Sequence, residues 1–204
     1  MNNTDSSNMR GRRWIALVAV LFFVFMAACS RSQHWLLHDI SGLSPALKFR
    51  LTDDTGRTVE ASNYRGKVVL LYFGYTHCTD VCPDTLAKLA GAIDNLGSEG
   101  ADVRVLFVTV DPARDTIPVL HRYVREFGPE FVGLRGSNDA LLALAKRYRV
   151  VYTRAKANAH GNYDVSHSSG VFIFDGSGKA RLLATNADTA ADISHDLRLL
   201  LRTG

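Results

Sequence analysis

The chain has 204 residues and a formal net charge of +4, and 47% of its residues are hydrophobic. This length suits one domain with a short extension, the composition excludes a disordered or collagen-like chain, and three cysteines are too few for a disulfide-stapled scaffold or a four-thiolate zinc site. Residues 1–28 carry three arginines and one aspartate, so the rest of the chain has a net charge of +2, which argues against a nucleic-acid partner.

The first segment predicts export to a membrane surface. Three arginines and then an unbroken apolar run, Trp14 to Ala28, lead to Cys29. This pattern is typical of a secretory signal peptide over residues 1–28, and a cysteine after two alanines resembles the site at which bacterial lipoproteins are cleaved and lipidated. An uncleaved membrane anchor is the alternative, although the run is shorter than the roughly 20 residues that span a bilayer. Both predict a bacterial envelope protein whose domain lies on the periplasmic or extracytoplasmic side.

The rest of the chain predicts a tether over residues 29–45 and one α/β domain over residues 46–204. Apolar runs, helical spacing and turn residues define its elements. We expect strands near 49–51, 58–59, 68–73, 103–110, 171–174 and 180–183, and helices near 83–96, 118–127, 141–148 and 188–201. This order is that of a thioredoxin-like fold with an N-terminal hairpin and inserted elements.

Two cysteines lie close together where the strand at 68–73 leads into a helix. Cys78 and Cys82 are four residues apart, so on a helix their side chains would share one face. Such a pair can chelate a soft metal ion or close into a redox disulfide. A helix N-terminus lowers the pKa of a nearby thiol, so we expect reactive thiolates here. A purely structural disulfide is the alternative, but so small a loop would stabilise the fold little.

Three segments in order resemble the motifs of the Sco/SenC family. They are residues 73–84, residues 108–116 and residues 163–168. The resemblance implies a membrane-tethered, thioredoxin-fold protein that binds copper and helps to assemble the binuclear copper centre of cytochrome c oxidase. It also implies Cys78, Cys82 and His167 as the copper ligands. Thr79 stands where the family usually has proline, which affects the stiffness of the loop more than the identity of the ligands.

The residue types agree with copper. Two thiolates and one imidazole suit Cu(I) and can also hold Cu(II), with one ion per chain, whereas structural zinc would need a fourth ligand. His77 is a rival ligand beside Cys78, and His167 has the alternative of being a hydrogen-bonded loop residue. Arg114 and Asp115 are expected to pair and fix their loop. Asp111 follows a central strand, where it could orient a metal ligand without binding the metal itself, or simply cap a turn.

Three functions compete. The first is a metallochaperone that serves the copper-bearing subunit of cytochrome c oxidase, directly or with another periplasmic copper carrier. The second is a thiol–disulfide oxidoreductase in which Cys78 and Cys82 cycle to keep the partner's cysteines reduced, so the sequence leaves open whether the protein is an enzyme. The third is a redox sensor or a peroxidase. The loop directly before the strand at 171, where thioredoxins use a proline to dock peptide substrates, contains no proline, and this favours copper binding over general reduction.

Overall fold

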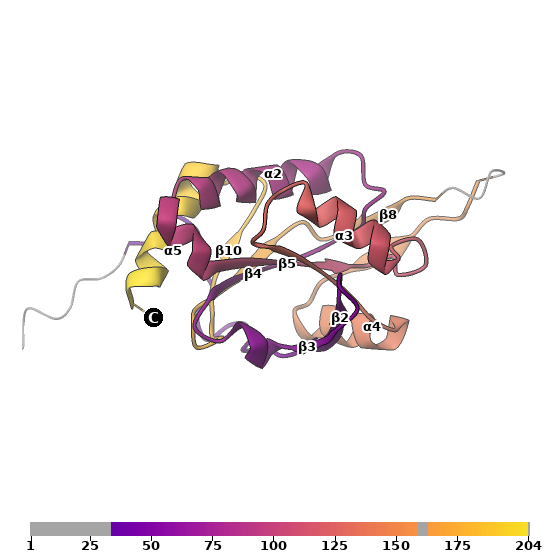
Figure 1. Cartoon of the computed structure of the whole chain (residues 1–204), viewed down its shortest axis with the longest axis horizontal. Coiled ribbons are helices and arrows are strands. Elements are labelled where there is room, and N and C mark those ends of the chain that lie inside the picture. Colours follow the sequence, from indigo (N-terminus) through magenta and orange to yellow (C-terminus); the bar gives the residue numbers. More distant parts are fainter. Residues whose placement is uncertain (1–33, 159–162, 204) are drawn as a thin grey trace, which may run out of the picture. The chain divides into compact units, whose positions relative to one another are not determined.

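The computed structural model describes residues 34–158 and 163–203, and from Trp35 onward they form one unit. Its main sheet has eight strands in the order β1-β10-β9-β4-β5-β6-β2-β3 (Figure 1). The strands are β1 (His38–Asp39), β2 (Arg50–Asp53), β3 (Thr58–Glu60), β4 (Val68–Gly74), β5 (Val103–Thr109), β6 (Phe131–Arg135), β9 (Val171–Phe174) and β10 (Ala180–Ala184). A separate two-stranded sheet pairs β7 (Tyr152–Arg154) with β8 (Val165–His167).

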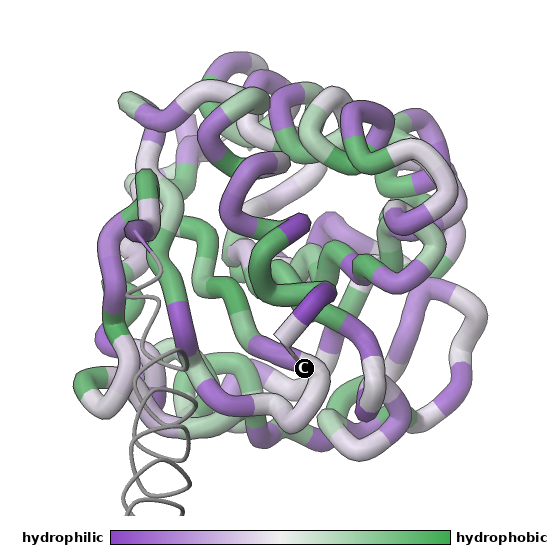
Figure 2. Tube along the Cα trace, turned by 90° about the vertical axis from the view of Figure 1, so that its left-hand side faces the viewer, coloured by the Kyte–Doolittle hydropathy of each residue, from purple (hydrophilic) through white to green (hydrophobic). Residues whose placement is uncertain are grey.

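The centre of the sheet is apolar on both faces. Strands β4 and β5 run parallel, and every residue of β4 is buried, as expected of an uninterrupted apolar run. Figure 1 shows helices on both sides of the sheet, with α2 (Val81–Asp94) and α3 (Ile117–Arg125) above it and α4 (Asn138–Arg147) below. In Figure 2 the coiled segments of the tube alternate between hydrophobic and hydrophilic residues, as expected of helices with one buried face. The last helix, α5 (Ala190–Thr203), packs against α2.

The predicted elements are confirmed, with shifted bounds and additions. Helix α2 begins at Val81, two residues before the expected start, and the hairpins β2–β3 and β9–β10 are antiparallel as predicted. Two short 3-10 helices, η1 (Ala61–Tyr64) and η2 (Gly97–Asp102), precede β4 and β5. Strands β1, β6, β7 and β8 were not predicted. Strand β6 extends the parallel core, and its Gly133 has no room for a side chain, because a Cβ there would lie 2.4 Å from Leu120 Cγ.

The described part of the predicted tether packs on the domain. Strand β1 pairs with β10, and the backbone N–H groups of Leu36 and Leu37 donate to the Asp196 carboxylate of α5 at 3.0 and 2.9 Å. Cys29 and the apolar run before it lie outside the described residues. Within residues 34–158 and 163–203, no helix has the length and hydrophobicity to cross a membrane.

Candidate metal centre

The structure brings Cys78, Cys82 and His167 together. One potential ligand atom from each residue lies within 4.8 Å of the other two. His167 Nε2 is 3.2 Å from Cys82 Sγ, and the backbone N–H of Cys82 donates to Cys78 Sγ at 3.4 Å. No other group of three or more His, Cys, Asp or Glu residues in the described part of the chain is arranged to hold a metal ion.

The two cysteines lie in different structural settings. Cys82 is in the first turn of α2 and has no exposed surface, whereas Cys78 lies in the loop before the helix and is half-buried. The expectation that both would share one helix face is therefore wrong, because α2 begins only at Val81. The two sulfur atoms nevertheless lie within 4.8 Å of each other, because the loop brings Cys78 Sγ next to the backbone N–H of Cys82.

The burial of Cys82 decides its acidity. Loss of solvent raises the pKa of the Cys82 thiol to about 12, although the backbone N–H of Tyr75 and the Tyr72 hydroxyl act in the opposite direction. The predicted lowering of its pKa by the helix N-terminus is therefore wrong, because desolvation outweighs the helix dipole at this buried position. A metal ion would have to displace the thiol proton.

His167 reaches the cysteines from the two-stranded sheet. It ends β8 opposite Tyr152 of β7. Its Nδ1 is 3.0 Å from the carbonyl oxygen of Ser168, which assigns the ring proton to Nδ1 and leaves the Nε2 lone pair facing Cys82. Burial lowers the pKa of His167, so the imidazole is neutral at pH 7 and free to act as a ligand.

Two tyrosines that the sequence analysis did not assign to the site form its wall. The Tyr72 hydroxyl lies 3.6 Å from Cys82 Sγ, and the Tyr72 ring is 5.9 Å from the His167 ring. The Tyr75 ring also lies 6.1 Å from the His167 ring, edge to face. Tyr72 is buried in the core, but its hydroxyl faces a thiol. The available signal was a polar hydroxyl in an otherwise apolar buried strand, which needs a partner.

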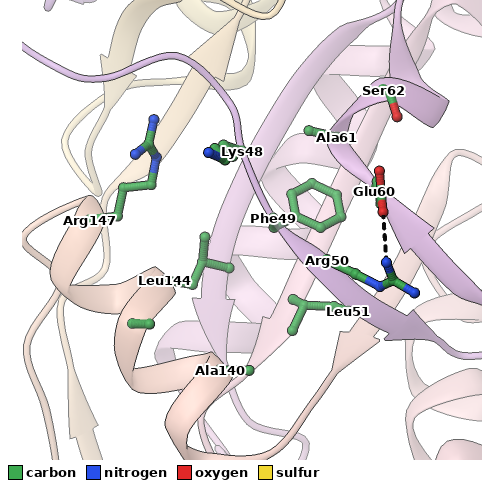
Figure 3. Close-up of a pocket in the computed structure, with 11 residues that line it drawn as sticks. Lys48, Phe49, Arg50, Leu51, Glu60, Ala61, Ser62, Ala140, Leu144 and Arg147 are labelled. Carbon is green, nitrogen blue, oxygen red and sulfur yellow. Dashed lines mark hydrogen bonds and ion pairs between the residues drawn. The ribbon is translucent and has the colours of Figure 1, made fainter.

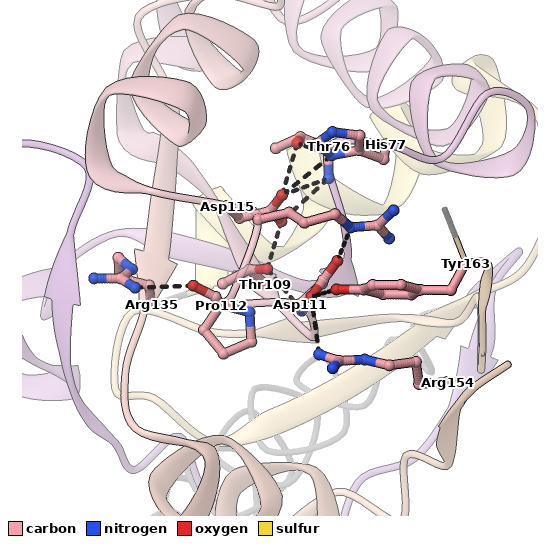
Figure 4. Close-up of polar contacts among 10 residues, drawn as sticks. Thr76, His77, Thr109, Asp111, Pro112, Asp115, Arg135, Arg154 and Tyr163 are labelled. Atoms are coloured by element: carbon pink, nitrogen blue, oxygen red, sulfur yellow. Dashed lines mark hydrogen bonds and ion pairs between the residues drawn. The ribbon is translucent and has the colours of Figure 1, made fainter. Parts of the chain in front are cut away.

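Asp111 belongs to a polar cluster beside the site (Figure 4). Its buried carboxylate accepts hydrogen bonds from Arg114 Nε, from Arg154 at 3.1 Å and from the Tyr163 hydroxyl at 2.7 Å. No hydrogen bond joins Asp111 to any of the three potential ligands in the described residues. The expected pair of Arg114 with Asp115 is wrong, because Arg114 pairs with Asp111.

Asp115 instead holds the cysteine loop. Its carboxylate accepts from the Thr76 hydroxyl at 2.7 Å, from the Thr76 backbone N–H at 3.2 Å and from the Thr109 hydroxyl at 2.5 Å (Figure 4). His77, the rival ligand, is 51% exposed and points its Nδ1 toward Thr76 and Asp115, outside the group of ligand atoms. Asp115, in the segment that follows β5, thus fixes the loop that carries Cys78.

The remaining histidines serve other contacts or lie on the surface. His121 pairs with Asp54 at 2.6 Å, and His195 pairs with Asp196 at 2.9 Å. His34 and His38 are exposed, and His160 lies outside the described residues.

A pocket lies away from the cysteine–histidine group, between the β2–β3 hairpin and α4 (Figure 3). Phe49, Leu51 and Leu144 line it with Lys48 and Arg147, and Arg50 beside them pairs with Glu60 at 3.4 Å. It contains no thiol or imidazole, so it offers none of the soft donors of the cysteine–histidine group.

Comparisons with known proteins point to one family. A family model described as SCO1/SenC matches residues 43–202. Protein SCO1 homolog 1, mitochondrial, of Arabidopsis thaliana is 44% identical over 126 residues, which are 61% of this chain and 37% of that protein. Protein SCO2 homolog, mitochondrial, of Bos taurus is 38% identical over 152 residues, which are 74% of this chain and 57% of that protein. The chain therefore spans about half or less of the length of these two relatives.

A solved structure agrees with the fold. The crystal structure of Arabidopsis thaliana ScoI with copper bound matches with a TM-score of 0.73 and 34% sequence identity, covering 79% of this chain and 100% of that one. The predicted thioredoxin-like α/β fold is confirmed.

Proposed function

Because the chain belongs to the SCO1/SenC family, we propose that Cys78, Cys82 and His167 bind one copper ion per chain. We further propose that the protein is a membrane-tethered metallochaperone that helps to assemble the binuclear copper centre of cytochrome c oxidase. Its partners are then the copper-bearing subunit of the oxidase and, as a source of the ion, another periplasmic copper carrier.

One observation supports this proposal above the others: two sulfur atoms and one imidazole nitrogen converge within 4.8 Å. Soft thiolates with an imidazole are a donor set that copper favours in both of its oxidation states. Structural zinc would need a fourth ligand, and the group holds only three in the described residues. A copper-bound relative with the same fold adds support.

The unequal exposure of the two thiols suits a carrier. Cys82 is fully buried, whereas Cys78 is half-buried and lies in a loop. A partner's thiol can therefore approach from the Cys78 side while Cys82 and His167 still hold the cargo. Copper would then pass between proteins by stepwise exchange of ligands.

The domain would work at a membrane surface. Lipidation of Cys29, or an anchor formed by residues 14–28, would hold it in the bacterial envelope on the periplasmic or extracytoplasmic side. Trp35, where the described unit begins, follows Cys29 by only a few residues, so the tether leaves the domain near the bilayer.

Asp111 would position His167 without touching it. Arg154 ends β7 and Tyr163 lies shortly before β8, and both bind the Asp111 carboxylate (Figure 4). Arg154 is paired in register with Val165, two residues before His167. Asp111 therefore fastens the strands that carry the histidine to the end of β5.

A second candidate is thiol–disulfide exchange with the oxidase subunit. Cys78 and Cys82 are free thiols whose sulfurs lie within 4.8 Å, so a small movement would close a disulfide. In that reaction the two thiols lose two electrons and two protons, and a disulfide of the partner takes them up to become two thiols. This activity needs both cysteines but does not need His167.

The test is a competition titration of the full chain in detergent, with Cu(I) against a colorimetric chelator. We expect one tightly held copper per chain, lost in Cys78→Ser and in Cys82→Ser but retained in His77→Ala, the matched control. Wild-type affinity in either cysteine variant would refute the site. No competitive binding together with reduction of a partner disulfide would establish the exchange activity instead.

A further inference from the structure

Tyr72 is a fully buried residue with one polar atom. It lies in β4, the central strand, opposite Phe107 of the neighbouring strand β5. Its side chain has no exposed surface. A buried tyrosine hydroxyl usually has a hydrogen-bond partner inside the protein. In this structure Cys82 Sγ is such a partner, 3.6 Å from the hydroxyl oxygen, and the Thr85 side chain also lies within hydrogen-bonding reach.

The same side chain also meets the third ligand. The ring of His167 lies 5.9 Å from the Tyr72 ring with an interplanar angle of 73°. One rigid side chain thus touches both residues whose ligand atoms are 3.2 Å apart. Since β4 is fixed by β5 on one side and β9 on the other, Tyr72 has little freedom to move.

We propose that Tyr72 is a positioning residue of the copper site, whose hydroxyl donates a hydrogen bond to the Cys82 sulfur while its ring supports His167. The inference rests on the proposed function and adds to it a determinant of how strongly each oxidation state of copper is held.

The chemistry follows from burial. A buried thiolate without contact to water is unfavourable in free energy unless a hydrogen-bond donor points at its sulfur. The Tyr72 O–H is such a donor, and it draws electron density from the sulfur. Hydrogen bonds around a cysteine ligand raise the reduction potential of copper, which favours Cu(I). Residues that hydrogen-bond to a metal ligand without touching the metal typically contribute about 10–100-fold to metal affinity.

The chain contains a matched control. Tyr123 also carries a buried hydroxyl, but this one has no hydrogen-bond partner in the described residues. Its ring lies 5.4 Å from Phe107, which in turn is 6.1 Å from Tyr72. Tyr123→Phe therefore removes the same atom as Tyr72→Phe, from the same aromatic cluster, without removing a hydrogen bond to the sulfur.

The experiment compares the full chain in detergent with Tyr72→Phe and Tyr123→Phe, using copper salts alone as the probe. For Tyr72→Phe we expect Cu(I) affinity to fall by about tenfold or more. Cu(II) affinity should fall less, and the thiolate-to-Cu(II) absorption band should move to longer wavelength. A tenfold greater loss for Cu(I) than for Cu(II) corresponds to a reduction potential lower by about 59 mV. Tyr123→Phe should match the wild type in all three measurements.

Melting of the metal-free proteins checks folding. If Tyr72→Phe unfolds, replacement of Tyr72 by 3-fluorotyrosine keeps the ring and strengthens the donor, so the absorption band should move to shorter wavelength. A folded Tyr72→Phe with the wild-type band and affinities would overturn the role of Tyr72 alone. A wild-type chain that binds no copper would overturn the proposed function, and this inference with it.

Discussion

The two sides of the candidate metal centre are built by different physical means. The thiol side belongs to the core, since Cys82 is fully buried at the start of α2, directly behind the central strand β4. The imidazole side belongs to a two-stranded sheet that makes no strand pairing with the main sheet in the described residues. Apolar packing therefore sets the position of the buried sulfur, whereas polar contacts fasten the strands that carry His167 to the rest of the domain.

One short loop controls both sides. Asp111 and Asp115 are both fully buried and follow β5. Asp111 binds Arg154 and Tyr163 of the histidine side, and Asp115 binds Thr76 of the cysteine side. Substitution of Asp111 should therefore perturb the histidine side, and substitution of Asp115 should perturb the cysteine side.

The strongest perturbation of the thiol side is Gly74→Ala. A Cβ at Gly74 would lie 2.6 Å from Phe107 Cε2 and 3.1 Å from Cys82 Sγ, so the core and the sulfur would both have to shift. We expect a loss of about 1–3 kcal/mol in the free energy of unfolding, measured with denaturant, and weaker Cu(I) binding. The control is Gly91→Ala in α2, where the nearest atom is 3.8 Å away. It should stabilise the helix by about 0.5–1 kcal/mol. Equal stability of the two variants would show that the sulfur side is not tightly packed.

The imidazole side is perturbed most directly by His167→Ala. The backbone pairing of β8 with β7 does not need the side chain, so the fold should remain. Two thiolates alone can hold Cu(I), whereas Cu(II) favours the additional nitrogen. We expect Cu(II) affinity to fall at least about tenfold more than Cu(I) affinity, a difference of about 1.4 kcal/mol, by parallel titrations with the two ions. Equal losses would mean that His167 has another role.

A finer comparison sets Asp111→Asn against Asp115→Asn. Each variant removes one buried charge and leaves its donors imperfectly paired, at a cost of about 1–3 kcal/mol. Asp111→Asn should act on the histidine side, changing Cu(II) binding more than Cu(I) binding. Asp115→Asn should act on the loop that carries Cys78 and weaken Cu(I) binding. If both variants changed the two affinities in the same proportion, the loop would act as one unit and the two sides would not be separable.

The sequence predicted the parts of this arrangement that depend on local pattern. The apolar run in β4 was typical of a buried central strand, and the spacing of Cys78 and Cys82 predicted that their thiols would meet. The contact between Cys82 and His167 spans 85 positions, so the residues alone left it open and only the family resemblance suggested it. Strands β7 and β8 were missed because they are three residues long and largely exposed, without a clear alternation.

Tertiary effects account for the errors at the site. The helix N-terminus suggested a lowered pKa for Cys82, but the burial that raises it comes from β4 and the surrounding core. In the same way, the sequence shows that Tyr72 lies in a buried strand but not which way its hydroxyl points. Both properties depend on the packing of α2 against the sheet, which no local pattern encodes.

The smallest predicted effect distinguishes hydrogen bonding from stacking in the cluster that holds the histidine side. Tyr163 donates to Asp111 at 2.7 Å, and the guanidinium groups of Arg114 and Arg154 lie 3.7 and 4.4 Å from the centre of its ring. Tyr163→Phe keeps the ring and loses one hydrogen bond, so we expect a loss of about 1 kcal/mol in the free energy of unfolding. Tyr163→Leu also loses both cation–π contacts, each worth about 0.5–1 kcal/mol at a partly exposed site. Denaturant unfolding of both variants, with hydrogen exchange of the β8 amides as a local measure, separates the two contributions. A Leu variant no less stable than the Phe variant would mean that the stacked arginines add nothing, and that the Asp111 carboxylate alone holds the imidazole side.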